Sequence, residues 1–350
     1  LYKWNKYSYY WRKCFLMSDI IRFATIDDVD DIMEFIHNHW KKNHILSQNK
    51  NFFLYEHQDN NRINFVVYRD SKNKLGGILG FIKSSSNNSD IWTVLWKALS
   101  NKEHPMLGIE LFDFLRKSQD YNILLSPGIN GKTIGIYKYL GIYTGYLRQF
   151  VLINDKIKKF KIAKILDKKY LQQVQFIENN EYNLKQLSER EVLFDFEKYK
   201  ETIPYKDKRY FIKRYFNHPI YKYDVYGIFK NSEIHSLLVT RVVSKNGSNV
   251  LRIVDFIGDQ EVLKFVTQNL YEKITDEKYE YMDFMCFGFD NELLLKAGFH
   301  QINSDSSDLI IPNHFSPFVS ENIKINFFAD TSQIEKVRMC KADGDQDRPV

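Results

Sequence analysis

Cysteine is scarce in this sequence, and its basic N-terminal segment lacks a long apolar run. The three cysteines, Cys14, Cys286 and Cys340, are odd in number and far apart, so they supply neither a disulfide framework nor the ligand spacing of a zinc site. The nine histidines are equally scattered. We therefore expect no metal site and a reducing, cytoplasmic environment.

The first residues, LYKWNKYSYYWRKCFL, are basic and aromatic. They contain no apolar run long enough for a signal peptide or a membrane span. Met17 lies just before the first clear strand and looks like a natural start. We predict that residues 1–16 lie outside the functional fold.

An excess of either charge is also missing. The 50 basic residues are nearly offset by 44 acidic ones, which leaves a net charge of +6. This balance mildly favours anionic ligands and lacks the basic footprint of a nucleic-acid-binding protein. The chain is 44% hydrophobic and 16% aromatic, which suffices for sizeable cores and excludes wholesale disorder. A length of 350 residues suits two domains better than one.

Hydrophobic periodicity predicts strands and helices along the first part of the chain. Thr25 precedes a helix with an acidic first turn, and Gly141 ends another helix, as a glycine at positive φ does. The predicted strands are 20–24, 63–68, 75–82, 90–99, 121–125 and 143–153, and the predicted helices are 25–40, 47–57, 106–118 and 133–140.

The pattern restarts after residue 159. Residues after Asn313 are poorly patterned, and the tail KADGDQDRPV is expected to be exposed or mobile. The predicted strands are 162–166, 225–229, 234–243, 250–257, 281–286 and 308–311, and the predicted helices are 168–177, 187–199, 206–217, 260–274 and 291–297.

The stretch 130–142 carries the clearest motif. Asn130, Thr133, Tyr137 and Gly141 fall on the pattern N-x-x-A-x-x-x-Y-x-x-x-G-F, with isoleucine in place of the phenylalanine. This motif and the order of elements over residues 19–153 resemble the GNAT acyltransferases. The resemblance implies an α/β fold in which a twisted, mostly antiparallel mixed sheet is flanked by helices. The other interpretation of the motif is an ordinary helix that ends at a glycine.

A weak internal repeat extends the resemblance to the second half of the chain. The stretch Lys296-Ala297-Gly298-Phe299 echoes Tyr139-Leu140-Gly141-Ile142. We therefore predict two tandem GNAT-like domains, an acyltransferase domain at 17–153 and a second domain at 154–313 that shapes the acceptor site, followed by a C-terminal tail at 314–350.

Acyl transfer from a thioester requires a grip on the donor's pyrophosphate. In GNATs a loop resembling R/Q-x-x-G-x-G/A precedes a helix, whose first amides favour anions. The corresponding loop here is 103–108, and only its last glycine, Gly108, is kept. Gly108 would serve equally well for close packing of the helix on the sheet. The predicted cofactor-binding residues are Met106, Leu107, Gly108, Ile109, Asn130 and Thr133.

The reaction also needs a polarised carbonyl and groups that move protons. Backbone amides around residues 92–96 are predicted to polarise the carbonyl, with Trp92 beside the substrate. Tyr137 is the predicted acid for the leaving thiolate; the alternative is a helix tyrosine that packs on the sheet. The candidate bases are Asp90, His57 and Glu56, which would otherwise serve as caps or turn residues.

The second domain lacks the acid, because Leu294 occupies the position that corresponds to Tyr137. Its segment 258–260 could bind an anion, although Asp255 and Asp259 would repel one. Three residues that mix cations with aromatic rings are predicted to bind substrate, or else to end a helix before a turn: Arg214, His218 and Tyr221.

The resemblance implies transfer of an acetyl or larger acyl group from acyl-CoA to a small-molecule amine, without a metal. Similar tandem chains are associated with bacterial surface-polysaccharide synthesis, which makes a nucleotide-linked amino sugar the first acceptor to test. Two other classes remain open. One is a FemABX-like aminoacyltransferase that uses aminoacyl-tRNA, and the other is a catalytically silent binding protein. We expect no nucleic-acid partner and no membrane span; the oligomeric state is open.

Overall fold

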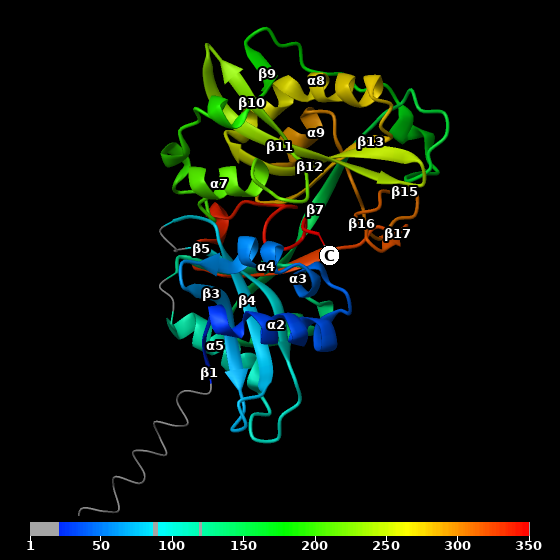
Figure 1. Ribbon diagram of the computed structural model, residues 1–350. Coiled ribbons are helices and arrows are strands. Elements are labelled where there is room, and N and C mark those ends of the chain that lie inside the picture. The colour runs from blue at the N-terminus through cyan, green and yellow to red at the C-terminus, as the bar shows by residue number, and fades with distance from the viewer. Residues whose placement is uncertain (1–20, 87–89, 119–120, 350) are drawn as a thin grey trace, which may run out of the picture. The chain divides into compact units, whose positions relative to one another are not determined.

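The computed structural model describes residues 21–86, 90–118 and 121–349 (Figure 1). The prediction for residues 1–16 lies outside this range. The chain divides into two compact units. The first contains the described residues up to Lys83 and Ile91–Leu124, and the second contains the short segment Ser84–Asp90 and Leu125–Pro349. The predicted boundary after residue 153 therefore lies within the second unit.

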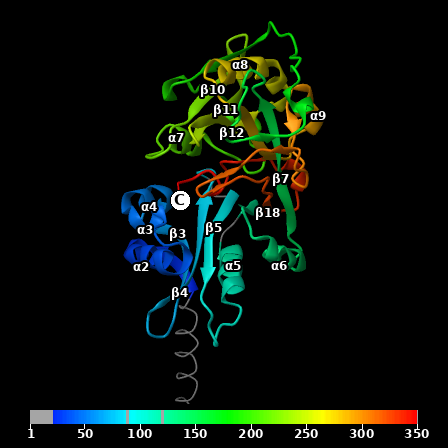
Figure 2. The same ribbon diagram turned by 90° about the vertical axis from the view of Figure 1, so that its right-hand side faces the viewer.

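The first unit is an antiparallel sheet in the order β1-β3-β4-β5. Helices α2, α3 and α4 lie on one side of these strands and α5 on the other (Figure 2). On the α5 side, Gly77 lets the helix approach β4, because a Cβ there would lie 3.0 Å from Leu111. The elements are β1 (Ile21–Thr25), η1 (Ile26–Asp28), α2 (Val29–Phe35), η2 (Ile36–Trp40), α3 (Ile45–Gln48), α4 (Lys50–His57), β2 (Gln58–Asp59), β3 (Arg62–Arg69), β4 (Leu75–Lys83), β5 (Asp90–Ala98) and α5 (Leu107–Ser118).

A buried carboxylate fixes the start of the first helical stretch. Thr25 and Asp28 form the capping box that the acidic turn predicts. The Asp28 carboxylate, 2% exposed, also accepts hydrogen bonds from Arg22 and Arg69. Although burial opposes the shift, these donors lower the pKa of Asp28 below its ordinary value.

The second unit is a sheet in the order β18-β7-β13-β12-β11-β10-β9. In this sheet the β12–β13 pair is parallel, and the other pairs of neighbouring strands are antiparallel. The principal elements, after β6 (Ile123–Pro127), are η3 (Gly131–Thr133), α6 (Ile134–Tyr139), β7 (Tyr143–Ile153), β9 (Tyr182–Gln186), α7 (Lys208–Tyr215), β10 (Asp224–Lys230), β11 (Glu233–Lys245), β12 (Ser248–Gly258), η7 (Gln260–Val262), α8 (Leu263–Asp276), β13 (Tyr281–Phe287), α9 (Asn291–Lys296) and β18 (Ile325–Asp330).

Short elements fill the connections of the second unit. They are β8 (Lys164–Ile165), η4 (Lys168–Leu171), η5 (Glu189–Glu191), η6 (Phe196–Tyr199), β14 (His300–Gln301), β15 (Leu309–Ile310), β16 (His314–Phe315), β17 (Phe318–Val319), η8 (Ile334–Lys336) and β19 (Met339–Cys340).

Each face of this sheet has its own apolar core. Leu263, Val266 and Leu270 of α8 pack with α9 against β10–β13 on one face. Phe211 and Tyr215 of α7 pack against the opposite face of β10–β12. Helices on both faces explain why β10, β11 and β12 alternate little between buried and exposed residues.

Two predicted helices of the second half are wrong. Residues 168–177 contain only the short turn η4, and 187–199 contain only η5 and η6. Asp167, Ser188 and Asp195 cap these turns, and a cap followed by apolar residues is also what a helix start looks like. The edge strand β9 was not predicted, because most of its side chains are exposed.

The expectation of an exposed or mobile tail is also wrong. β18 pairs with β7 from Ile325 to Ala329 and so belongs to the sheet of the second unit. β19 pairs with β13, and buried residues continue to Asp347. Residues 314–349 are thus an integral part of the second unit.

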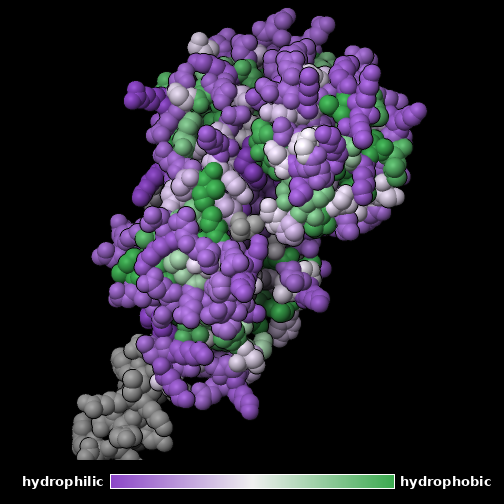
Figure 3. Space-filling view, turned by 45° about the vertical axis from the view of Figure 1, so that its right-hand side comes forward, coloured by the Kyte–Doolittle hydropathy of each residue, from purple (hydrophilic) through white to green (hydrophobic). Residues whose placement is uncertain are grey.

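Hydrophilic side chains cover most of the face shown in Figure 3, with hydrophobic ones in small groups. No helix among the described residues combines the length and the apolar character needed to span a membrane.

Candidate functional site

A β-bulge interrupts β5, the strand predicted to polarise the carbonyl. Trp96 lies opposite Leu79 and Val94 lies opposite Gly80, so Leu95 has no partner on β4. Leu95 also has a φ of +44°, an uncommon conformation for a residue with a branched side chain. Its side chain is buried in the core of the first unit. The bulge therefore turns main-chain groups out of the ladder at the predicted position.

The helix after this strand begins without a side-chain cap. Met106, which is 56% exposed, precedes α5, and its carbonyl accepts the first helical hydrogen bond, from Glu110 N. The side chain of a methionine has no oxygen that could accept a hydrogen bond from the amides of the first turn. Met106 therefore does not cap the amides of Gly108 and Ile109. The indole of Trp96 donates to the carbonyl of Gly108 at 3.1 Å. Gly108 therefore lies against β5, but a Cβ there would lie 3.6 Å from the Trp96 indole, an ordinary contact, so the packing does not require a glycine.

One further side-chain contact lies at this junction. His104 Nδ1 lies 2.6 Å from Glu110 Oε2, so the acidic side chain of the first turn already has a partner. Leu107 is buried in the sheet face, unlike its neighbour Met106.

Asn130, Thr133 and Tyr137 are brought together at α6. Asn130 caps η3 by accepting from Lys132 N at 3.0 Å, and the Thr133 hydroxyl donates to the Asn130 carbonyl at 2.7 Å. Tyr137 is 4% exposed and stacks on Phe328, with ring centroids 4.5 Å apart. Burial raises the pKa of Tyr137 to about 12, against the effect of its hydrogen bond with Thr133.

This packing is the alternative that the sequence left open for Tyr137. A phenol with a pKa near 12 is a poor match for a thiolate, whose conjugate acid has a pKa near about 8.5. The role of Tyr137 as an acid stays a prediction, and its surroundings speak against it.

The candidate bases are buried rather than placed in a polar loop. His57 ends α4 at 1% exposure, with its ring 4.7 Å from Phe65 and 5.4 Å from Phe53. The i,i+4 spacing of Phe53 and His57 puts both on the buried face of the helix. Asp90, 1% exposed, accepts from the backbone amide of Tyr205. Glu56 and Trp92 are also buried.

The three predicted substrate residues of the second half do form one cluster. The group that fills it is Asp347 of the protein itself, and not a ligand. Arg214 donates to the Asp347 carbonyl at 2.6 Å, and the ring of His218 stacks on Tyr221. Arg241 binds the Asp347 carboxylate and lies 4.2 Å from the Tyr221 ring centroid. The C-terminal segment thus occupies the position assigned to a ligand.

The second unit repeats the strand–bulge–helix arrangement. Asp255 lies opposite Val239 and Ile253 lies opposite Thr240, so Val254 is the bulged residue of β12. Here the cap belongs to the short turn η7 that precedes α8, where the Asp259 carboxylate accepts from Glu261 N at 3.0 Å.

Asp255, predicted to repel an anion, is neutralised within the protein. Lys206 lies 2.6 Å from Asp255 and 2.7 Å from Asp343, and both carboxylates are fully buried. The Tyr215 hydroxyl also donates to Asp255. Although burial opposes the shift, the two carboxylates raise the pKa of Lys206.

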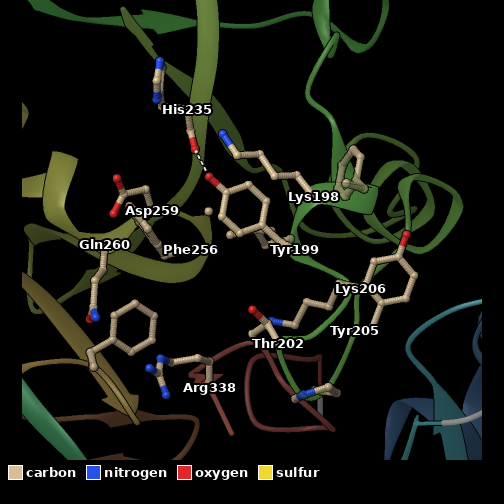
Figure 4. A pocket seen from close by; sticks show the side chains of 15 residues that line it. Lys198, Tyr199, Thr202, Tyr205, Lys206, His235, Phe256, Asp259, Gln260 and Arg338 are labelled. Atoms are coloured by element: carbon tan, nitrogen blue, oxygen red, sulfur yellow. Dashed lines mark hydrogen bonds between the residues drawn. The ribbon is translucent and has the colours of Figure 1, made fainter. Parts of the chain in front are cut away.

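A cavity of about 440 Å³ opens at the end of β12 (Figure 4). It contains charged, amide and aromatic side chains, and a hydrogen bond of 3.1 Å joins the Tyr199 hydroxyl to the His235 carbonyl. The lining includes Phe196, Lys198, Tyr199, Thr202, Pro204, Tyr205, Lys206, His235, Phe256, Ile257, Gly258, Asp259, Gln260, Phe289 and Arg338.

Sequence reasoning missed most of this cavity. Arg338 lies in the segment expected to be a tail, and Tyr199 lies in a stretch predicted as helix. One signal could have shown that the supposed tail is folded: the apolar run INFFA at 325–329, which is typical of a buried strand. Among the described residues, no group of three or more His, Cys, Asp or Glu side chains is arranged to hold a metal ion.

No family model and no curated protein matches the sequence. Among solved structures, a GCN5-related N-acetyltransferase from Anabaena variabilis matches with a TM-score of 0.54 and 10% identity, over 88% of this chain and 71% of that one. A conserved protein of unknown function from Enterococcus faecalis matches with a TM-score of 0.53 and 8% identity, over 90% and 73%.

A third structure, Saccharomyces cerevisiae N-myristoyltransferase with bound myristoyl-CoA, matches with a TM-score of 0.43 and 10% identity, over 89% and 79%, and adds nothing to the fold assignment. The first match agrees with the predicted class, and the architecture is a mixed, mostly antiparallel sheet with helices on its faces. The chain therefore has the GCN5-related N-acetyltransferase (GNAT) fold.

Proposed function

We propose that the protein is an acyl-CoA-dependent N-acyltransferase. The observation that carries this proposal is the bulge at Leu95 in β5, which lies on the strand that leads into α5. A bulge next to a helix start offers two sets of main-chain amides in one region. In acyl transfer, such amides stabilise the charge that develops on the carbonyl oxygen.

The start of α5 supports a donor site in the first unit. Its N-cap position is Met106, which is exposed and carries no charge. The positive end of the helix dipole is therefore open to an anion such as a pyrophosphate. At α8 the Asp259 carboxylate lies in the corresponding place and opposes a second anion.

For the acceptor, we propose an amine, with a nucleotide-linked amino sugar of surface-polysaccharide synthesis as the first to test. The two units are, in this proposal, tandem GNAT-like domains, and the bulges at Leu95 and Val254 support that repeat. Tyr137, His57 and Asp90 are buried, so we assign the acid and the base to none of them.

Calorimetry and an acyl-transfer assay test the donor site. We expect acetyl-CoA and desulfo-CoA to bind the full chain, and Met106→Asp to weaken both by about tenfold, because the new charge faces the pyrophosphate. The same substitution provides a good N-cap and should not lower the melting temperature. Met106→Asn is the uncharged control and should bind acetyl-CoA as the wild type does.

Three outcomes separate the classes. Unchanged affinity in Met106→Asp would place the donor elsewhere. No binding of acetyl-CoA at millimolar concentration would favour the silent binding protein. Labelling of an acceptor that depends on aminoacyl-tRNA would favour the FemABX-like alternative.

A further inference from the structure

The cavity at the end of β12 contains more positive charge than its own carboxylates neutralise. Its lining contains Lys198, Lys206 and Arg338 but only one acidic residue, Asp259. Lys206 is bound to Asp255 and Asp343, and Asp259 caps the turn before α8. The charge that stays available inside the cavity is mainly that of Arg338.

Arg338 is half-buried and has no carboxylate partner. Its Nη1 donates to the carbonyls of Glu335 and Val337, at 3.2 and 3.1 Å, and no ion pair within the part of the chain that the structure describes includes it. Burial lowers the pKa of this guanidinium. Because a buried charge without a counterion is costly, an anionic ligand is the partner that fits.

The backbone holds Arg338 in this position. Its amide donates to the Ile203 carbonyl at 2.7 Å, and Ile203 N donates to the Lys336 carbonyl at 3.1 Å. Gly288, at a φ of +80°, lets this segment approach, since a Cβ there would overlap the Val337 carbonyl. The arginine is therefore placed by main-chain contacts, and its side chain reaches into the cavity toward Gln260 (Figure 4).

Aromatic rings form the other part of the lining. Tyr199 is fixed by its hydrogen bond to His235 and by stacking on Phe194 at 5.4 Å. Phe256 and Phe289 meet edge to face, with ring centroids 5.9 Å apart. Rigid rings of this kind bind flat, apolar groups.

The polar end of the site borders a second cavity. Gln260, Phe289 and Arg338 line both cavities, and the lining of the second also includes Glu335 and Asp290, whose carboxylate caps α9. Gln260 Oε1 accepts from Asp290 N at 3.0 Å. Because the oxygen of the side-chain amide makes this bond, the NH₂ group of Gln260 is left to donate to a ligand. A guanidinium and an amide between two neighbouring spaces suit an elongated ligand with a phosphate at its middle.

We propose that this cavity of the second unit binds a nucleoside diphosphate, with its diphosphate at Arg338 and Gln260 and its ring system against Tyr199, Phe256 and Phe289. The cavity volume of about 440 Å³ lies within the usual range for small-molecule sites. The proposal deepens the proposed function, on which it rests for the role of the ligand: the nucleotide is the carrier end of the acceptor.

Calorimetry on the full chain with UDP, ADP, inorganic pyrophosphate and acetyl-CoA tests this assignment. We expect at least one of the two nucleotides to bind more tightly than pyrophosphate, because pyrophosphate lacks the stacked ring. Arg338→Gln should weaken that nucleotide by at least about tenfold and leave acetyl-CoA affinity unchanged. Arg338→Lys should give an intermediate loss, since it keeps the charge without the planar fork.

Lys336→Gln is the matched control, because Lys336 pairs with Glu201 on the surface and does not line the cavity. It should bind the nucleotide as the wild type does. If Arg338→Gln fails to fold, Gln260→Ala removes the second donor and should still weaken the nucleotide by several-fold.

Absence of binding by both nucleotides would overturn the proposal. An equal loss of acetyl-CoA affinity in Arg338→Gln would also overturn it, since the cavity would then hold the donor. Nucleotide binding without any acetyl-CoA binding or transfer would instead contradict the proposed function and support the nucleotide site.

Discussion

The two strand–helix junctions of this protein share a backbone design and differ in charge. In each, a bulge interrupts a central strand, at Leu95 in β5 and at Val254 in β12, and a long helix follows. The first helix starts after an exposed methionine, whereas the second follows the turn η7, which an aspartate caps. The same fold therefore presents an open helix start in one unit and an occupied one in the other.

In the two proposals made above, the backbone at the start of α5 binds an anion in the first unit, and the side chain of Arg338 binds one in the second. Where Asp259 caps the turn before α8, the positive group near the cavity is Arg338, from the far end of the chain. Four experiments follow; the first compares the two units directly, and the other three compare sites within the second unit.

The largest difference is expected between two lysines that pair with aspartates. Lys206→Met leaves Asp255 and Asp343 buried without a cation, which should cost about 3–5 kcal/mol. In the first unit, Lys83→Met breaks the partly exposed pair with Asp59 and should cost about 1 kcal/mol or less. Urea unfolding measures both, and equal losses would contradict the buried character of the Lys206 cluster.

The glycines that end α6 and α9 give the next comparison. Gly141 and Gly298 both have positive φ, of +73° and +94°. A Cβ at Gly141 meets nothing within 4 Å, whereas one at Gly298 would lie 2.5 Å from Val174. Gly141→Ala should cost about 1–2 kcal/mol from backbone strain, and Gly298→Ala roughly 1–3 kcal/mol more. Thermal unfolding would refute this if the order were reversed.

Lys341 predicts a pH dependence that arises in the second unit. It is 2% exposed, and burial, aided by Arg252 and Arg241, lowers its pKa to about 7 against the attraction of Asp347 and Asp283. The unfolded chain, with an ordinary pKa of 10.5, binds more protons than the native chain between these values. Stability therefore rises with pH from about 7 toward 10.5, while below pH 7 both states are protonated and the cost of the buried charge is fully present.

Lys341→Met should remove this slope. Between about pH 8 and 9, the free energy of unfolding of the wild type should rise relative to that of the variant by up to about 1.4 kcal/mol per pH unit. Urea unfolding at several pH values measures the gain. Parallel pH profiles would show that the amine is charged in the native state.

The smallest effect is expected for Tyr137→Phe. An acid that takes part in the reaction contributes about 10²–10⁴-fold to the rate, whereas a buried tyrosine stacked on Phe328 should lose less than about threefold. Loss of its hydrogen bond should cost about 0.5–1.5 kcal/mol. Tyr139→Phe, on the same helix and 90% exposed, is the control. A hundredfold loss of turnover in Tyr137→Phe alone would restore it as the acid.

The sequence predicted the elements that carry strong periodic patterns. β7 and the meander β10–β12 were predicted correctly, because each strand is a run rich in β-branched and aromatic residues that is bounded by turn residues. The capped turns after Asp167 and Asp195 were mistaken for helices, since a cap specifies only how a helix begins. β18 was missed although its run INFFA is apolar, because its partner β7 lies far away in sequence and the pairing itself leaves no local signal.

The candidate site was less predictable than the fold. The bulge at Leu95 was not predicted; it lies within residues 92–96, where the resemblance indicated carbonyl polarisation, and that role stays a prediction. His57 and Asp90 were chosen for their chemistry, yet chemistry alone does not reveal burial, and both lie at 1% exposure. Arg338 could not be found, because its proposed role depends on the side chains that surround it in space, which come from distant parts of the sequence.

The position of β18 beside β7 has a consequence for how this protein is made. The ribosome extends the chain from its N-terminus, so β7 leaves the exit tunnel long before Ile325–Asp330 is synthesised. One edge of β7 must wait for its neighbour until residue 330 has been synthesised, and Asp343 and Asp347 arrive later still to meet Lys206 and Arg241. The second unit therefore reaches its final form only after residue 347 has been released, whereas the first can fold while synthesis continues.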